Sequence, residues 1–249
     1  MHDALITRHS RHLLLDQFGF EAQDRVSLAN MLIVGAGGLG SPALLFLTAS
    51  GVGQLSIYDH DRVDETNLAR QVLYCESDIG EFKAEAAKRR LRGLNSNVRV
   101  KAYSRRLEGE ELTRTVAEHD VIIDCTDNFS ARLQLDAACR AWRKPLVSGA
   151  AVRFQAYVTV FDFRDPAQGC LRCALGDVLQ VEPTACATMG VFGPMVGVIG
   201  SLIASEALKL TGQVGTSLIS RISTFDALES RWFEVAFDRD PTCPACAAL

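Results

Sequence analysis

Acidic and basic side chains suited to phosphate chemistry recur along the first half of the chain. Asp59 and Asp61 follow one apolar run, Arg70 and Lys83 come soon after, and Asp127 follows another apolar run. A carboxylate can hold Mg²⁺, and cations can neutralise a polyphosphate while a phosphate is attacked. Hydride transfer needs no such accumulation of charge beside its nucleotide. As a set these residues favour chemistry on ATP, although any one of the two cations alone is more often a solvated surface charge.

A glycine-rich segment predicts where a nucleotide phosphate lies. It directly follows the apolar run 31–34, and its glycines are Gly35, Gly37, Gly38 and Gly40. Glycine tolerates positive φ and close ligand approach, and the helix expected over residues 39–50 directs free N–H groups at a bound anion. Asp59 ends the next apolar run at the spacing typical of a ribose-binding carboxylate. The pattern predicts a mononucleotide-binding strand–helix–strand unit and leaves both NAD and ATP open.

Bulk properties indicate an ordinary soluble globular protein. The 249 residues suit one large α/β domain, with 48% hydrophobic and 22% charged residues. A net charge of −4 gives no reason to expect nucleic acid or an anionic membrane as partner. Charged residues interrupt segment 1–15, so it lacks a signal-peptide core. The apolar stretch 191–204 contains glycines and a proline and is too short for a membrane span, so we expect a buried or interface helix and a cytoplasmic protein.

Apolar and amphipathic segments alternate through the first 150 residues, which is typical of a doubly wound sheet. Strands are expected at 31–34, 55–58, 98–103, 121–124 and 145–148, and helices at 5–17, 39–50, 83–94, 108–117 and 129–142. The pattern then changes to antiparallel-type strands at 157–163, 219–225 and 231–237, a helix at 191–210 and a loop-like region at 165–189. We expect one α/β domain over residues 1–249, with a mainly parallel, Rossmann-like sheet extended by antiparallel strands in its C-terminal part.

Four of the eight cysteines form two widely separated C-x-x-C pairs, which are Cys170, Cys173, Cys243 and Cys246. In a reducing compartment two such pairs indicate a tetrahedral zinc site more than two disulfides. Unligated thiols remain the alternative. The other cysteines are scattered singly, as buried packing residues usually are.

The chain resembles the ThiF/MoeB/HesA family of ubiquitin-activating-like adenylyltransferases. The resemblance runs from about Arg8 to Cys246, in an ordered series of motifs that is highly specific. Besides both C-x-x-C pairs, the motifs are residues 10–12 (SRH), 32–40 (LIVGAGGLG), 51–53 (GVG), 67–71 (NLARQ) and 124–128 (DCTDN). Residues 145–153 (PLVSGAAVR) look closer to the molybdopterin-synthase branch than to the thiamine-pathway branch.

The resemblance implies an enzyme that uses ATP to adenylate the C-terminal glycine of a small ubiquitin-fold sulfur carrier ending in Gly-Gly, with release of pyrophosphate. Residues up to about 150 would bind the nucleotide, and residues 151–249 would bind the carrier and a structural zinc ion held by the four paired cysteines.

The resemblance also implies roles for single residues. The glycines around Gly38 would contact phosphate, Asp59 the ribose, and Arg70 and Lys83 the phosphates, while Asp127 would position Mg²⁺. The implied nucleotide-binding set also includes Asp61 and Asn67. Arg11 would reach into the site of a partner subunit, as an arginine finger does, which implies a homodimer.

The chain departs from the family pattern at Ala69, where glutamine is usual, at Phe82, where proline is common, and over residues 154–157, where the carrier tail should thread. Cys186 aligns with a cysteine that some relatives use for sulfur or carrier transfer and others do not require. Three alternatives stay open at this point. They are adenylation of a peptide or a tRNA base, an NAD-dependent oxidoreductase, and a non-catalytic protein that only docks a carrier.

Overall fold

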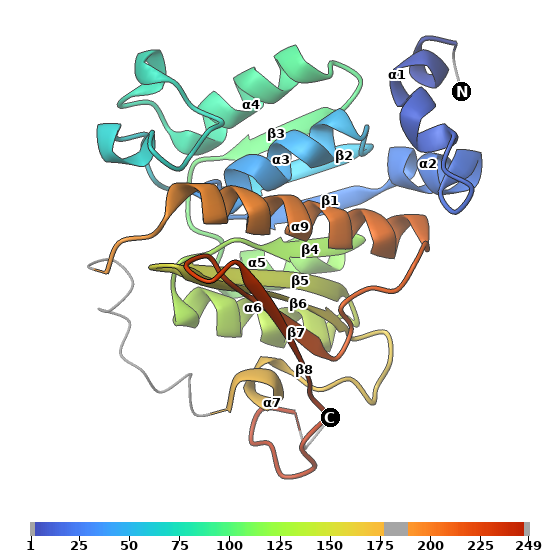
Figure 1. The fold of residues 1–249 in the computed structure, drawn as a ribbon, viewed down its shortest axis with the longest axis vertical. Coiled ribbons are helices and arrows are strands. Elements are labelled where there is room, and N and C mark those ends of the chain that lie inside the picture. Colours follow the sequence, from blue (N-terminus) through green and yellow to red (C-terminus); the bar gives the residue numbers. More distant parts are fainter. Residues whose placement is uncertain (1–2, 177–188, 247–249) are drawn as a thin grey trace.

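One mixed sheet organises the molecule. The computed structural model describes residues 3–176 and 189–246, and Figure 1 shows their arrangement. The strands lie in the order β3-β2-β1-β4-β5-β6-β7-β8. Their bounds are β1 Asn30–Val34, β2 Gln54–Tyr58, β3 Arg99–Tyr103, β4 Val121–Asp124, β5 Pro145–Val152, β6 Gln155–Asp162, β7 Arg221–Asp226 and β8 Arg231–Ala236. The five strands from β3 to β5 are parallel and the last three are antiparallel, which confirms the expected fold class.

The central parallel strands β1 and β4 are apolar because helices cover both faces of the sheet there. Every residue of β4 is buried, and the three central residues of β1 are buried as well. The chain order reverses between β1 and β4, which are neighbours in the sheet although β2 and β3 lie between them in sequence. Ligands of open α/β sheets bind beyond the carboxyl ends of the strands at such a switch point. The glycine-rich segment and residues 124–128 both begin there.

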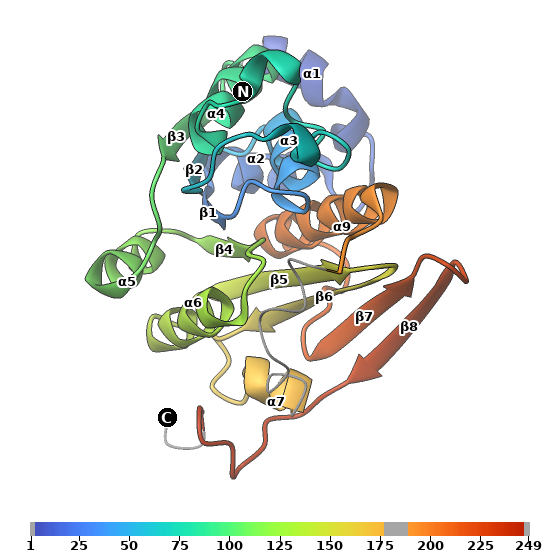
Figure 2. The same ribbon diagram turned by 90° about the vertical axis from the view of Figure 1, so that its left-hand side faces the viewer.

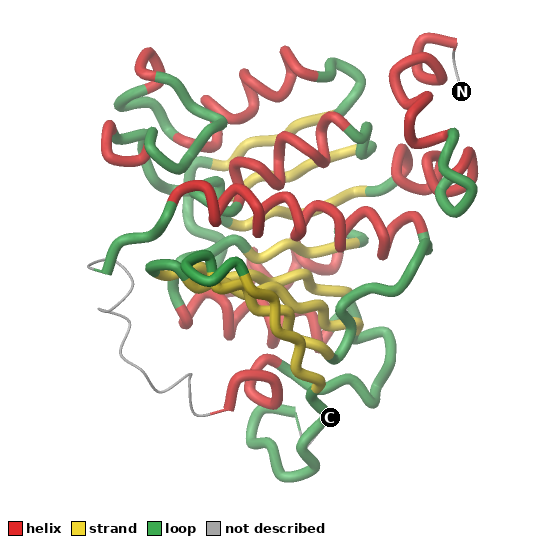
Figure 3. The backbone as a smooth tube through the Cα atoms, viewed as in Figure 1, coloured by secondary structure: helices red, strands yellow, loops and turns green. Residues whose placement is uncertain are grey.

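Two helical layers cover the parallel part of the sheet, whereas β7 and β8 extend beyond them (Figures 1, 2 and 3). Helices α2, α3, α4 and α9 pack on one face and helices α5 and α6 on the other. Helix bounds are α1 Asp3–Leu13, α2 Gly19–Leu28, α3 Gly40–Ala49, α4 Lys83–Leu94, α5 Gly109–Ala117, α6 Phe129–Ala141, α7 Leu171–Leu175 and α9 Gly193–Gly212. Two single 3-10 turns, η1 Glu65–Asn67 and η2 Glu76–Asp78, lie between β2 and α4.

Helix α9 joins the two halves of the chain. It packs along α3 and across β5 and β6, and a Cβ at Gly200 would lie 2.4 Å from the carbonyl oxygen of Leu39. Among the described residues it is the helix whose length and composition could cross a membrane, yet 56% of its most apolar window is buried. The packing agrees with the expected core helix.

The structure differs from the sequence-based expectation in three elements. The first helix ends at Leu13, and an unexpected helix, α2, follows because Gly19 has a φ of +57° and turns the chain. Strand β5 continues to Val152 because β6 pairs with all of its residues. The expected loop at 165–189 contains the short helix α7.

Candidate active site

The glycine turn has the geometry that only glycine permits. Gly35 has a φ of +94°, and a Cβ there would lie 2.5 Å from the carbonyl oxygen of Cys125. A Cβ at Gly40 would lie 2.1 Å from the carbonyl oxygen of Gly35, so the turn closes directly onto the start of α3. No side chain caps that helix. The Ser41 N–H donates to Gly37 O at 2.9 Å and Pro42 has no N–H, so among the described residues the N–H groups that could meet an anion are those of segment 37–40.

Asp59, which follows β2, is bound to the glycine turn. Its Oδ2 accepts a hydrogen bond from the Ala36 N–H at 2.7 Å, and its Oδ1 accepts one from the Asp61 N–H at 2.8 Å. Burial raises the pKa of the Asp59 carboxyl, while these two N–H groups and the charge of Lys83 act to lower it. Each oxygen keeps an acceptor position beyond these bonds, so a ribose hydroxyl could still bind.

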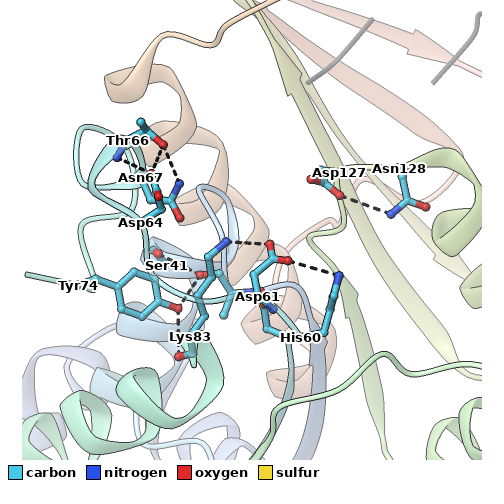
Figure 4. A network of polar contacts seen from close by, with 12 residues as sticks. Ser41, His60, Asp61, Asp64, Thr66, Asn67, Tyr74, Lys83, Asp127 and Asn128 are labelled. Atoms are coloured by element: carbon cyan, nitrogen blue, oxygen red, sulfur yellow. Dashed lines mark hydrogen bonds and ion pairs between the residues drawn. The ribbon is translucent and has the colours of Figure 1, made fainter. Parts of the chain in front are cut away.

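Lys83 is a buried cation at the first position of α4 (Figure 4). Its Nζ lies 2.9 Å from Oδ2 of Asp61, whose own carboxylate is about half exposed. Burial acts to raise the pKa of Asp61, but the hydrogen bond and charge of Lys83 lower it overall. His60 adds a contact of 3.3 Å to the same carboxylate. The Tyr74 hydroxyl donates to Ala36 O at 2.8 Å and lies 3.3 Å from Lys83 O, which joins the lysine backbone to the glycine turn.

Phe82, at the position where the resemblance led us to expect proline, precedes Lys83 directly. The Phe82 backbone is extended, with ψ of 130°, and the Arg62 guanidinium lies 3.8 Å above its ring. The Lys83 N–H donates to Asp61 O at 2.9 Å. The substitution therefore leaves the lysine beside its aspartate.

Residues 67–71 form a turn that lies between the glycine turn and the start of α9 and contacts both. Asn67 is buried and Arg70 half-buried. The Arg70 side chain passes 3.9 Å from the Cβ position of Gly38. A Cβ at Gly193 would lie 2.6 Å from Ala69 O, so the turn and the helix are in close contact. The methylene chain of Arg70 thus lies next to the glycines, while its Nη1 donates to Thr66 O at 2.9 Å.

Asp127 is exposed after β4, on the other side of the switch point. Asn128 caps α6 by accepting a hydrogen bond from the Ala131 N–H at 2.9 Å, and its Nδ2 lies 3.4 Å from Asp127 Oδ1. Figure 4 shows Asp127 set apart from the Lys83–Asp61 pair, with no contact drawn between them. Its carboxylate is free of cationic partners among the described residues.

A buried ion pair that sequence reasoning missed supports the Asp127 turn. Arg132 Nε donates to Asp124 Oδ2 at 3.0 Å, and both side chains are almost inaccessible to solvent. The same oxygen accepts from Ser148 Oγ, and Thr126 donates to Asp124 Oδ1 through its N–H and its hydroxyl. Arg132 also donates to the Tyr157 hydroxyl. Asp124 was in the motif, but a spacing of eight residues gave no signal that Arg132 is its partner.

Arg11 lies far from the glycine turn of its own chain. Helix α1 is attached at the C-terminal end of α4, where Arg8 Nη1 donates to Leu94 O at 3.2 Å. Lys83 stands at the other end of that twelve-residue helix, about 16.5 Å from Leu94 along the helix axis. Figure 1 shows α1 on the side of the molecule opposite the loops between β2 and α4. The structure therefore does not bring Arg11 together with the other predicted site residues.

The four paired cysteines come together at helix α7, which contains Cys173 and has Cys170 as its N-cap residue. The Sγ–Sγ distances are 3.8 Å for Cys170–Cys173, 3.7 Å for Cys170–Cys243 and 3.5 Å for Cys173–Cys246, and all four sulfurs lie within 4.8 Å of one another. Zn–S bonds of about 2.3 Å place the sulfurs of a tetrahedral site about 3.8 Å apart. Although burial acts to raise it, backbone N–H groups lower the pKa of Cys243 to about 7. The donor set and its spacing fit zinc.

The altered segment 154–157 forms part of the β5–β6 hairpin. Phe154 packs on Phe192 with ring centroids 5.3 Å apart. A cavity of about 300 Å³ lies here, lined by Val152, Arg153, Phe154, Gln155, Met189, Asp226 and Leu228.

Cys186 lies outside the described residues.

The fold and its switch-point site are those of a nucleotide-binding α/β enzyme. The model of the ThiF family matches residues 9–245, and the chain belongs to that family. It is 38% identical over 244 residues to the molybdopterin-synthase adenylyltransferase of Salmonella typhimurium, covering 98% of this chain and 97% of the relative. It is 40% identical over 247 residues to the sulfur carrier protein ThiS adenylyltransferase of Escherichia coli, covering 99% and 97%. The chain is an adenylyltransferase.

Solved structures agree on the fold. The crystal structure of Escherichia coli MccB with ATP superposes with a TM-score of 0.82 at 24% identity, covering 96% of this chain and 74% of that one. At this identity the likeness shows the architecture alone.

Proposed function

We propose that this enzyme uses ATP to adenylate the C-terminal carboxylate of a small ubiquitin-fold sulfur-carrier protein ending in Gly-Gly. The carrier belongs to the molybdopterin or thiamine type, as the names of the relatives indicate. Those relatives are named as adenylyltransferases, which gives no support to an oxidoreductase or to another acceptor.

The buried Lys83 ammonium beside the glycine turn is the observation on which the proposal depends. A buried cation is costly unless a charge compensates it, and Asp61 already does so. The half-exposed Asp61 leaves the pair open to one side, where a polyphosphate would add further negative charge. Arg70, whose Cδ passes Gly38, would bring a second cation to the phosphates by exchanging the hydrogen bond from its Nη1 to Thr66 O for one to a phosphate oxygen.

The chemistry follows from these positions. A carboxylate oxygen of the carrier attacks the α-phosphorus, the bond from that phosphorus to the bridging oxygen breaks, and pyrophosphate leaves with the electron pair. Because the nucleophile is already an anion, no protein base is needed. Lys83 and Arg70 would stabilise the charge that develops on the phosphates. Asp59 would bind the ribose from the end of β2, and Asp61 and Asn67 would complete the nucleotide site.

Asp127 is the residue we assign to Mg²⁺. Its exposed carboxylate has no cationic partner among the described residues, whereas Asp61 is already paired. Mg²⁺ keeps several waters and is usually held by one or two carboxylates together with phosphates. Bound there, the ion would neutralise phosphate charge.

A homodimer would complete the site. Arg11 is exposed and lies at the opposite end of α4 from Lys83, so it could act only on a second subunit. Mixing an Arg11→Ala subunit with a Lys83→Gln subunit tests this directly. Mixed dimers should regain activity at one of their two sites, whereas two variants that stay inactive on mixing would argue for a site within one chain.

We assign the remaining parts by the same reasoning. The chain would act as a single adenylating domain, with nucleotide binding in residues up to about 150 and carrier and zinc binding in residues 151–249. β5 and α9 connect these parts physically. The cysteine cluster would hold structural zinc, and a cytoplasmic location suits this soluble chemistry. Whether Cys186 forms a covalent link to the carrier is a separate question from adenylation.

Exchange of labelled pyrophosphate into ATP tests the proposal. The exchange should appear only with a carrier that ends in Gly-Gly, and a carrier lacking the last glycine is the matched control. Pyrophosphate exchange at the same rate with and without such a carrier would refute the assignment. Tight binding of NADH in place of ATP would refute it as well.

A further inference from the structure

Helix α6 carries a second buried ion pair, one turn beyond Arg132. Arg140 Nε donates to Asp136 Oδ2 at 2.9 Å, and the two side chains are only 11% and 2% exposed. A buried ion pair is by itself weak evidence for a stabilising role, because removing the charges from water can cost as much as their attraction gains. The remaining hydrogen bonds of the pair therefore indicate what it does.

Each member of the pair holds one of the two C-x-x-C segments. Asp136 Oδ1 accepts a hydrogen bond at 2.9 Å from the N–H of Leu171, which lies between the two cysteines of the first segment. Arg140 Nη1 donates at 2.6 Å to the carbonyl oxygen of Ala245, which lies between the two cysteines of the second segment. Figure 2 shows α7 and the C-terminal tail beside α6. One ion pair thus contacts both halves of the cysteine cluster.

The two segments have little regular structure of their own. The first contains the five-residue helix α7, and residues 237–246 contain neither helix nor strand. The segments are also far apart in sequence, with 73 positions between Cys170 and Cys243. Four ligands from such segments must be ordered before they can share one ion, and ordering in advance lowers the entropic cost of binding. Attachment of both segments to one helix supplies that order.

A second arginine bonds to the same region but from within the tail. Arg239 Nη2 donates to Cys246 O at 2.6 Å, and its Nη1 donates to Pro166 O at 3.0 Å. These bonds join the tail to itself and to the loop before the first segment. The α6 pair, in contrast, joins both segments to the helical layer that covers the sheet.

We propose that Asp136 and Arg140 are positioning residues for zinc, which fix the two C-x-x-C segments on α6 in the arrangement that the ion binds. The inference rests on the proposed function, because it takes the cysteine cluster as a zinc site. Hydrogen-bonding partners that lie outside the ligand set of a metal typically change its affinity about 10- to 100-fold when they are removed. The pair acts on zinc in this way without contacting the ion.

Arg140→Met tests the assignment, because methionine fills much of the same space and removes both hydrogen bonds. The dissociation constant of Zn²⁺, measured on the zinc-loaded protein by competition with a chelator, should rise about 10- to 100-fold. Co²⁺ bound in place of Zn²⁺ should show an altered visible absorption spectrum, because the sulfurs are no longer held in the same geometry. Asp136→Asn keeps an acceptor for the Leu171 N–H and removes the charge that orients Arg140, so its effect should be in the same direction and smaller.

Arg25→Met is the matched control. Arg25 on α2 also donates from its guanidinium to a main-chain carbonyl, Gly212 O, at 3.0 and 2.7 Å, but it joins α2 to the end of α9. This variant should keep the zinc affinity and the Co²⁺ spectrum of the unchanged protein, whatever happens to its melting temperature. Should Arg140→Met not fold, Asp136→Asn carries the same comparison.

Unchanged zinc affinity in both α6 variants would overturn the inference. An equal loss of zinc affinity in Arg25→Met would overturn it too, because general destabilisation would then explain the effect. Both results would leave the zinc assignment intact as long as the unchanged protein binds zinc. An unchanged protein that binds no zinc would instead refute that part of the proposed function, and the inference with it.

Discussion

Arg132 and Asp124 form a buried ion pair between helix α6 and the sheet, with Nε and Oδ2 3.0 Å apart and both side chains nearly free of solvent contact. The pair joins α6 to the end of β4, immediately before the turn that presents Asp127. The position of Asp127 therefore depends on a charge pair buried behind it.

Breaking this pair should destabilise the fold. Arg132→Met leaves the Asp124 carboxylate buried without its cation, so we expect the free energy of unfolding to fall by about 3–5 kcal/mol in urea. Glu234→Gln is the control, because it removes the charge from the more exposed pair with Arg221. That change should lower the free energy of unfolding by no more than about 1 kcal/mol. An equal decrease in the free energy of unfolding in the two variants would show that burial of the Arg132–Asp124 pair does not matter.

Lys83→Gln should reduce the rate of pyrophosphate exchange by about 100-fold or more, because one preorganised charge at the phosphates is lost. Lys88→Gln on the same helix is the control. Lys88 is only half-buried and pairs with Glu85 at 3.9 Å, away from the glycine turn. A Lys83 variant as active as the Lys88 variant would remove Lys83 from the mechanism.

Zinc should be present at one ion per chain and be lost in Cys243→Ser. Since a structural metal stabilises the folded state, the melting temperature should fall with it. Cys75→Ser, at an exposed cysteine outside the cluster, should keep both the metal and the stability. Elemental analysis beside thermal unfolding checks this, and a metal-free protein of full stability would contradict the zinc assignment.

The stability should depend on pH through His119. Burial lowers its pKa, and the ring is held between Thr115 O and Ser56 Oγ at 2.6 and 2.9 Å. The unfolded state therefore binds a proton first as the pH falls below about 6.5. Above that pH, His119 should not change the free energy of unfolding. Below it, the free energy of unfolding should fall by up to about 1.4 kcal/mol per pH unit, until the pH reaches the pKa of His119 in the folded protein.

His119→Gln should flatten this dependence below about pH 6.5. Urea titrations at several pH values measure the slope in both proteins. Parallel slopes would mean that other groups cause the dependence, among them His9, whose pKa burial also lowers.

The sequence predicted the bounds of a helix or strand best where a single local pattern defines that element. The helix expected at 83–94 and the strand expected at 121–124 have the observed bounds, because helix-forming composition and an unbroken apolar run define them. The C-x-x-C pairs were recognisable from spacing alone, and the fold brings their sulfurs together across 73 residues of chain.

Features that depend on tertiary contacts could not be read from the sequence. Arg132 meets Asp124 because α6 folds back over β4. Equally, nothing in the residues around Arg11 shows that α1 attaches at the end of α4 remote from Lys83.

Intact-mass spectrometry of the carrier is the most direct measurement of the central claim. After incubation with Mg·ATP and this enzyme, a carrier ending in Gly-Gly should gain the mass of one adenylyl group at its C-terminus, and Asp127→Ala should abolish the gain. A carrier that stays unmodified while ATP is bound, or one adenylated at an internal side chain, would contradict the account.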